Sequence, residues 1–375
     1  MKMRPLVLAI GALLGGAVSD SGSAETPSPM WARSLTEDLG SARQMDHGKL
    51  RDHDRAGLVF LDNDWLVVYE RRAVPALSSR EGLQTSRFRL RASLLRAATG
   101  ELQLRKEWGT RLHESGVYAT TGGLVVRTGR TLRLCSRDLE EIRRLELSTQ
   151  DLCDDRGVVA VRVSGSGRTV LTTSWGLNPY RTCFEVRDGD TLKQRSFWVG
   201  TTYWSAYSLS DIGVLHDEEG EHVLMTPFGR STWRVVWSCS PPGCAYSQAL
   251  TDGLLLNLSR GEVLLLSAGG QTLMTDRCEK HESIGGQAAV AQGGAAFAVT
   301  SALTRREWLA DLLDANIHAS ERRVVVYSVR LKKRILTVPV LPLPKLDYDF
   351  ALSPDGSKLA VLNDRRVALY AVPIQ

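Results

Sequence analysis

The side chains that could act as catalytic nucleophiles lack the sequence contexts that activate them. No serine lies in a G-x-S-x-G motif, which presents the nucleophile of many hydrolases on a sharp turn. No G-x-x-x-x-G-K-[ST] motif is present to hold a phosphate, and no H-E-x-x-H motif is present to hold a catalytic zinc ion. The sequence therefore contains no motif that predicts a hydrolase or a nucleotide-binding enzyme.

Histidine and carboxylate side chains, which are common metal ligands, gather in two short segments. Asp46, His47 and residues 52–54 (DHD) form the first, and residues 216–222 (HDEEGEH) form the second around an acidic turn. Charged residues beside Gly220 also suit an exposed hairpin tip that binds no ion. We interpret both segments as polar surface, so we predict no metal site, no cofactor and no catalytic residue.

Cysteine is present in an even number, which in an oxidising compartment suggests disulfide bonds. Six cysteines allow 15 pairings, and the sequence does not choose among them. The strongest candidate bridge joins Cys239 to Cys244 around the turn CSPPGC, because its prolines and glycine bend the chain back on itself. No C-x-x-C pair occurs, so zinc binding is not predicted. The six are Cys135, Cys153, Cys183, Cys239, Cys244 and Cys278.

Aromatic residues gather in the middle of the chain, around Trp198 to Trp237. Such residues can form a stacking surface for a glycan or an extended peptide, but more often they pack between sheets. The candidate partner surface that we name consists of Trp204, Tyr207 and Trp308.

The first 24 residues have the pattern of a secretory signal peptide. Lys2 and Arg4 precede an uncharged apolar run at 5–18, which is shorter than the roughly 20 residues of a membrane span. Small residues follow, and cleavage after Ala24 fits them. We therefore expect a mature chain of residues 25–375 in an extracytoplasmic space, periplasmic or secreted, with no membrane span.

The charged residues predict no polyanionic partner. The formal net charge is +5, but no block of five or six like charges occurs. We interpret the short basic clusters, such as residues 332–334 (KKR), as solvated surface. Nucleic-acid binding is therefore not expected.

One unit recurs along the chain: an apolar strand, a tight turn rich in Ser, Asp and Gly, and a second apolar strand. The clearest copy is residues 348–362 (YDFALSPDGSKLAVL). Four of the six spacings between turns lie between 40 and 46 residues, close to the ~40–45 residues of a four-stranded propeller blade. The seven turn positions are Asp64, Gly123, Gly167, Gly213, Gly253, Gly294 and Gly356.

These repeats predict an all-β chain folded as one seven-bladed β-propeller over 25–375, with six or eight blades as alternatives. After each repeated hairpin comes a more polar pair of strands, which gives about four strands per unit. The last unit is one strand short, so we expect residues 30–36 to complete it and close the ring. A capping box at Thr304 and Glu307 predicts a short helical insert over 304–317, which packs on its own blade or binds a partner.

The string SPDGSKLAV at 353–361 resembles the repeat of the WD40-like propellers of exported bacterial proteins, including the TolB-type and YVTN-type propellers. The resemblance covers about residues 57–375. Residues 97–108 (AATGELQLRKEW) are also similar to a quinoprotein-type blade, although Trp108 falls later than that pattern places it.

We expect a non-catalytic binding or scaffold module that is monomeric and recognises another protein of the envelope or the exterior. The alternative is a propeller enzyme, lactonase-like or quinoprotein-like, with a metal or cofactor in the central channel. Carboxylates that converge on such a channel need no fixed sequence spacing, so the sequence does not display them.

Overall fold

Strands and turns make up the part of the chain that the structure describes. The computed structural model describes residues 27–35, 37, 55–74, 87–110, 115–147, 153–176, 181–201, 206–211, 213–218, 222–227, 234–238, 244–251, 254–259, 262–267, 271–280, 282–304, 319–340, 350–363 and 366–374. In these residues no helix is long and apolar enough to cross a membrane. The helix expected at 304–317 lies outside them, apart from Thr304 at the end of a strand.

The described strands form seven antiparallel sheets of four strands each. Sheet 1 contains β2 (Arg55–Phe60), β3 (Trp65–Val74), β4 (Arg87–Arg96) and β5 (Leu102–Thr110). Sheet 2 contains β6 (Ser115–Thr120), β7 (Gly123–Thr128), β8 (Thr131–Cys135) and β9 (Glu141–Glu146). Sheet 3 contains β10 (Cys153–Val163), β11 (Thr169–Gly176), β12 (Arg181–Asp188) and β13 (Gln194–Thr201).

The remaining four sheets repeat the same up-and-down order. Sheet 4 contains β14 (Ala206–Leu209), β15 (Gly213–Glu218), β16 (His222–Pro227) and β17 (Arg234–Ser238). Sheet 5 contains β18 (Cys244–Thr251), β19 (Leu254–Ser259), β20 (Glu262–Ser267) and β21 (Thr272–Arg277). Sheet 6 contains β22 (Glu282–Val290), β23 (Ala296–Thr304), β24 (Ala319–Ser328) and β25 (Lys333–Val340). Sheet 7 contains β26 (Phe350–Leu352), β27 (Lys358–Asn363), β28 (Arg366–Ala371) and β1 (Trp31–Ser34).

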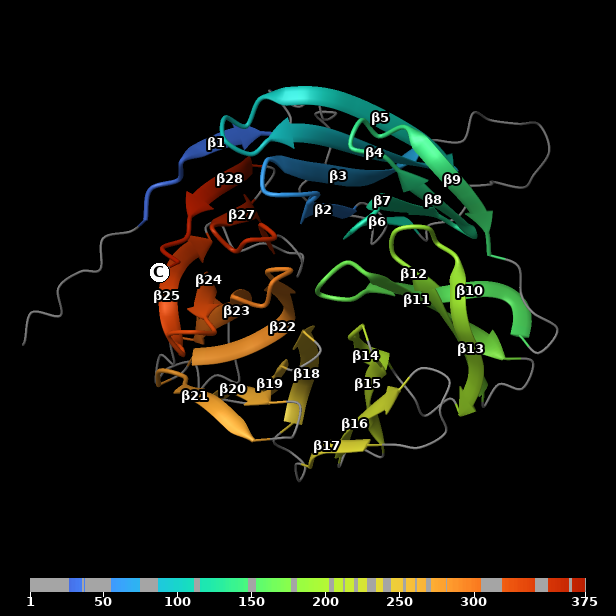
Figure 1. The fold of residues 1–375 in the computed structure, drawn as a ribbon. Helices are drawn as coiled ribbons and strands as arrows, with labels where there is room; N and C mark the ends of the chain where they lie inside the picture. Colours follow the sequence, from blue (N-terminus) through green and yellow to red (C-terminus); the bar gives the residue numbers. More distant parts are fainter. Residues whose placement is uncertain are drawn as a thin grey trace, which may run out of the picture.

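The seven sheets follow one another around a common centre (Figure 1), so the predicted all-β propeller is confirmed. Each sheet is a meander. The turn between its first and second strands and the turn between its third and fourth strands therefore lie at the same end of the ring. We call this end the turn face. Its described turns include residues 61–64, 164–168, 291–295, 329–332 and 353–357.

Sheet 7 joins the two ends of the chain. The blue strand β1 lies beside the red strand β28 in Figure 1, with Trp31 opposite Leu369. Trp31 also reaches the neighbouring sheet, where its Nε1–H donates to the Ala97 carbonyl oxygen at 2.8 Å. Sheet 7 thus takes its fourth strand from the start of the chain, in the place where the sequence analysis expected residues 30–36.

Apolar side chains fill the spaces between neighbouring sheets. Alternating residues of one strand point to opposite faces, so a strand such as β7, all six of whose residues are buried, serves two neighbours at once. Cores of buried apolar side chains lie at six of the seven junctions in the described residues; the core between sheets 7 and 1 includes Phe60, Leu66, Leu95, Leu362 and Leu369.

The contact between Trp31 and Gly100 gives a test of the closure. Gly100 has a φ of +71°, and a Cβ atom there would lie 2.7 Å from the Trp31 ring. Gly100→Ala should therefore lower the free energy of unfolding by roughly 1–3 kcal/mol, measured by chemical denaturation. Gly109→Ala is the matched control, because a Cβ there meets nothing within 4 Å; its effect should stay within about 0.5 kcal/mol. Equal changes in the free energy of unfolding for Gly100→Ala and Gly109→Ala would contradict the tight packing of Trp31.

Candidate functional site

The residues proposed from the sequence as a partner surface and a disulfide fall largely outside the described residues. Trp204, Trp308 and Cys239 lie there. Tyr207 is in β14, and Cys244 begins β18 opposite Ser259, but the structure describes neither side chain. The partner surface and the Cys239–Cys244 bridge therefore stay predictions.

The two candidate metal segments are placed no more fully. Asp46, His47 and residues 52–54 lie outside the described residues. In the second segment, Glu218 of β15 pairs with His222 of β16, with their side chains not described. Among the side chains that the structure does describe, no three His, Cys, Asp or Glu residues come close enough to hold a metal ion.

Two of the six cysteines are free thiols, so at most two disulfide bonds can form among the six. Cys135 is fully buried in the core between sheets 1 and 2, and Cys278 is half-buried beside the core between sheets 5 and 6. Burial raises the pKa of each thiol to about 11. A protonated thiol is a poor nucleophile, so these residues act as small apolar side chains. Cys183 is disulfide-bonded.

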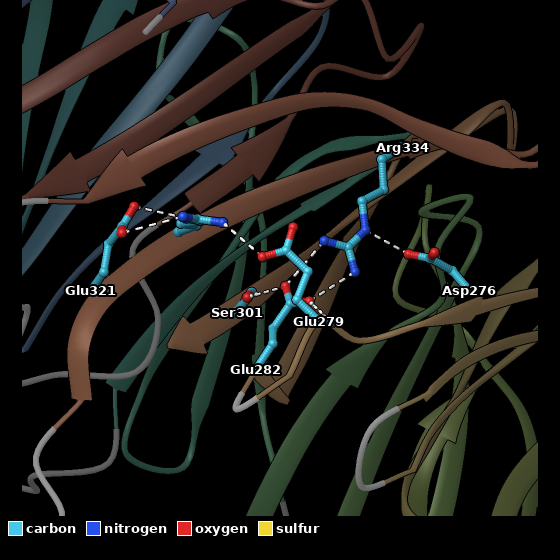
Figure 2. Close-up of polar contacts among 7 residues, drawn as sticks. Asp276, Glu279, Glu282, Ser301, Glu321 and Arg334 are labelled. Carbon is cyan, nitrogen blue, oxygen red and sulfur yellow. Dashed lines mark hydrogen bonds and ion pairs between the residues drawn. The ribbon is translucent and has the colours of Figure 1, made fainter. Parts of the chain in front are cut away.

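A polar cluster joins sheets 5 and 6, and Figure 2 shows most of its residues. Arg334 of β25 is its centre. Its Nε–H donates to Asp276 of β21, and its Nη1 and Nη2 groups donate to the two oxygens of Glu282 in β22, at 3.1 and 3.0 Å. The Tyr327 hydroxyl donates to the same Asp276 oxygen at 2.7 Å. One guanidinium thus connects two sheets.

Glu282 is the most buried member of this cluster. Its side chain has an exposed fraction of 0%, compared with 23% for Arg334. The Ser301 hydroxyl and the Glu279 backbone N–H also donate to it. Burial by itself would raise the pKa of Glu282, but the hydrogen bonds from Arg334, Ser301 and the backbone hold that pKa below its ordinary value. The carboxylate is therefore ionised and fully paired.

A second ion pair extends the cluster along β24. Arg323 donates to both oxygens of Glu321, and its Nη1 lies 3.9 Å from Glu279. Together these groups form a clamp between sheets. A general base needs a free lone pair near its substrate, and each Glu282 oxygen already accepts two hydrogen bonds. Glu282 therefore holds neighbouring strands together and has no free lone pair for a general base.

Sequence reasoning missed this clamp. It interpreted residues 332–334 as solvated surface, which is wrong for Arg334. The partners Asp276 and Glu282 lie more than 50 residues earlier in the chain. Tyr327 follows three valines in β24, a run that favours its burial. A buried tyrosine hydroxyl usually finds a polar partner, so this residue indicated a polar group nearby.

Hydrogen bonds also link the turns of neighbouring sheets on the turn face. Asp211 of sheet 4 accepts from three hydroxyls of sheet 3, at 2.6 Å from Ser164, 2.6 Å from Ser166 and 3.0 Å from Thr169. The Asp355 N–H of sheet 7 donates to the Asn63 side chain of sheet 1 at 3.0 Å. Backbone bonds from Thr121 to Gly167 and from Gly293 to Pro354 link two further pairs of turns. These contacts fix the positions of the turns relative to one another.

Comparisons with known proteins support the fold. The sequence matches no protein-family model and no curated protein. In three dimensions the chain is similar to the WD40 domain of Pan2 from Neurospora crassa, with 9% identity over 93% of this chain and 96% of that chain and a TM-score of 0.51. It is also similar to a chain in the mitotic checkpoint complex, with 12% identity over 98% and 99% of the two chains and a TM-score of 0.51. The fold is therefore that of a WD40-like β-propeller.

The clamp makes a testable contribution to stability. Arg334→Ala leaves the Glu282 carboxylate buried without its cationic partner and should lower the free energy of unfolding by about 3 kcal/mol at pH 7, measured by urea denaturation. Arg277→Ala, which removes an ion pair between exposed side chains, should cost less than about 1 kcal/mol.

The pH dependence of this difference has a definite sign. The pKa of Glu282 is lowered in the folded state, so the stabilisation that it supplies is present above its unfolded pKa and is lost as the pH falls through the folded value. The difference in the free energy of unfolding between wild type and Arg334→Ala should therefore become smaller as the pH is lowered. If this difference is constant down to pH 3, or is absent at pH 7, the stabilising role of the clamp is contradicted.

Proposed function

We propose that this chain is an exported binding module that recognises another protein and carries out no reaction of its own. The observation that carries the proposal is the way the ring holds its turns. Apolar cores and polar clamps fix neighbouring sheets, and hydrogen bonds between turns fix one end of the ring. A rigid frame of this kind presents many side chains at set positions, which lowers the entropy cost of binding.

Two further points support the proposal. The signal-peptide pattern of residues 1–24 favours export, so the partner belongs to the envelope or the exterior. One of the structurally similar chains comes from the mitotic checkpoint complex, an assembly of proteins, and a propeller frame suits the same kind of role here. We include Trp204, Tyr207 and Trp308 as the aromatic part of the binding surface.

The test is site-specific photo-crosslinking in cells that export the chain. A photoreactive residue at position 204 or 207 should yield one discrete crosslinked protein from the envelope or medium. The triple variant Trp204→Ala, Tyr207→Ala, Trp308→Ala should lower the yield at least about tenfold, as expected when aromatic contacts supply most of the binding energy.

Matched controls keep the result specific. A crosslinker at Ile142, whose side chain is 60% exposed on β9, should give no discrete product. The mature chain should begin at Glu25 when its N-terminus is sequenced. Absence of any crosslinked protein, or a native mass spectrum with a stoichiometric metal or organic cofactor, would overturn the proposal and favour a propeller enzyme.

A further inference from the structure

The turn between β24 and β25 carries three cationic side chains at its tip. Arg330, Lys332 and Lys333 are all exposed. We call these three residues the basic turn. The backbone around them is well held: the Leu331 N–H donates to the Ser328 hydroxyl at 3.1 Å, and the Val329 N–H donates to the Ala295 carbonyl at 3.0 Å. The backbone that carries the three charges is therefore held in place on the turn face.

The basic turn has no anionic partner among the described residues. None of its three side chains forms an ion pair or a hydrogen bond there, although two arginines of the same sheet do. The two carboxylates that contact Arg334, the residue after the basic turn, are already engaged, because Asp276 and Glu282 both pair with it. Among the described residues, the three cations of the basic turn are therefore left without a paired carboxylate.

The backbone of Lys332 adds a second observation. Its φ is +53°, a left-handed conformation that residues with a Cβ atom adopt reluctantly. The third and fourth strands of sheets 1, 2 and 3 are joined by turns that place Gly100, Leu139 and Leu192 at positive φ, and the ladder beside each turn has a register shift, as it does in sheet 6. Positive φ at this position is therefore a feature of the recurring turn. Of these four residues only Lys332 is exposed, so this turn presents a cation where the other three present a buried residue.

We infer that the basic turn is a docking site for an acidic segment of a protein partner. A segment with two or three closely spaced Asp or Glu residues would complement the three cations of this turn. Leu331, which is partly exposed, lies within the turn and offers apolar contact beside the charges. This inference rests on the proposed function, because it names the chemistry of part of the partner.

An anionic membrane is the less suitable occupant. Basic segments that bind lipid headgroups usually carry about four to eight clustered cations, and the basic turn has three. A protein partner can hold each carboxylate in place and exclude water around it, which strengthens a small number of charged contacts. Three charges on one turn are therefore better matched to a short acidic peptide than to a lipid surface.

The experiment measures binding of a labelled acidic peptide to the mature chain. The probe is a fluorescein-labelled ten-residue peptide of alternating Glu and Ser, and the readout is fluorescence anisotropy at low and physiological salt. Wild type should bind it saturably, more weakly at higher salt. The triple variant Arg330→Gln, Lys332→Gln, Lys333→Gln should raise the Kd at least about tenfold.

A matched variant controls for net charge. Arg168, Lys193 and Arg195 are exposed cations of sheet 3 at or next to the turn face. Their combined substitution to Gln removes the same three charges and should leave the Kd within about twofold. A single variant, Lys332→Gly, separates binding from folding: it should raise the melting temperature, because glycine tolerates positive φ, and should still weaken peptide binding.

An equal loss of peptide affinity in the two triple variants, or no saturable peptide binding by wild type, would overturn the inference. Binding to phosphatidylglycerol vesicles without binding to the peptide would overturn it in favour of a membrane. If the protein crosslinked at position 204 or 207 is captured equally by the basic-turn variant, the proposed function stands and this inference fails. If wild type crosslinks no protein, the proposed function itself fails.

Discussion

The structure depends on one constraint: each four-stranded sheet has two apolar faces, and both must be removed from water. A single sheet cannot do this for itself, and a stack of sheets would leave the two end faces exposed. Arranging the sheets in a ring gives every face a neighbour. The buried core shared by sheets 7 and 1 is therefore as necessary as any core inside the chain. It joins residues near position 60 to residues near position 369, which is why the N-terminal strand matters.

Polar contacts then fix what the apolar cores leave adjustable. Hydrophobic packing is non-directional and allows neighbouring sheets to slide. The Arg334 clamp and the Asp211 contacts are directional, and each crosses from one sheet to the next. The cost of burying the Glu282 carboxylate is offset by the several hydrogen-bond donors that surround it. This division of roles leaves a frame whose turns hold fixed positions, and it suits recognition of a partner.

The architecture could be predicted from the sequence because its signals are local. The successive turn residues Gly123 and Gly167 are separated by a blade spacing, and both have positive φ in the structure. The clamp could not be predicted, because the partners of Arg334 come from two other strands and their proximity depends on sheet twist. The free thiols of Cys135 and Cys278 were also missed, because an even number of cysteines says nothing about which of them face a partner. Two members of the basic turn, Lys332 and Lys333, were noted in the sequence, but whether the described residues pair with them could not be predicted.

Ring closure by β1 is the central claim, and a thermal melt tests it most directly. A mature chain that lacks residues 25–40 loses the strand that pairs with β28 and the Trp31 contact with Ala97. We expect its melting temperature to fall by on the order of 10 °C, and a synthetic peptide of residues 27–37 added in trans should restore much of that loss. A melting temperature unchanged by the deletion would contradict the account.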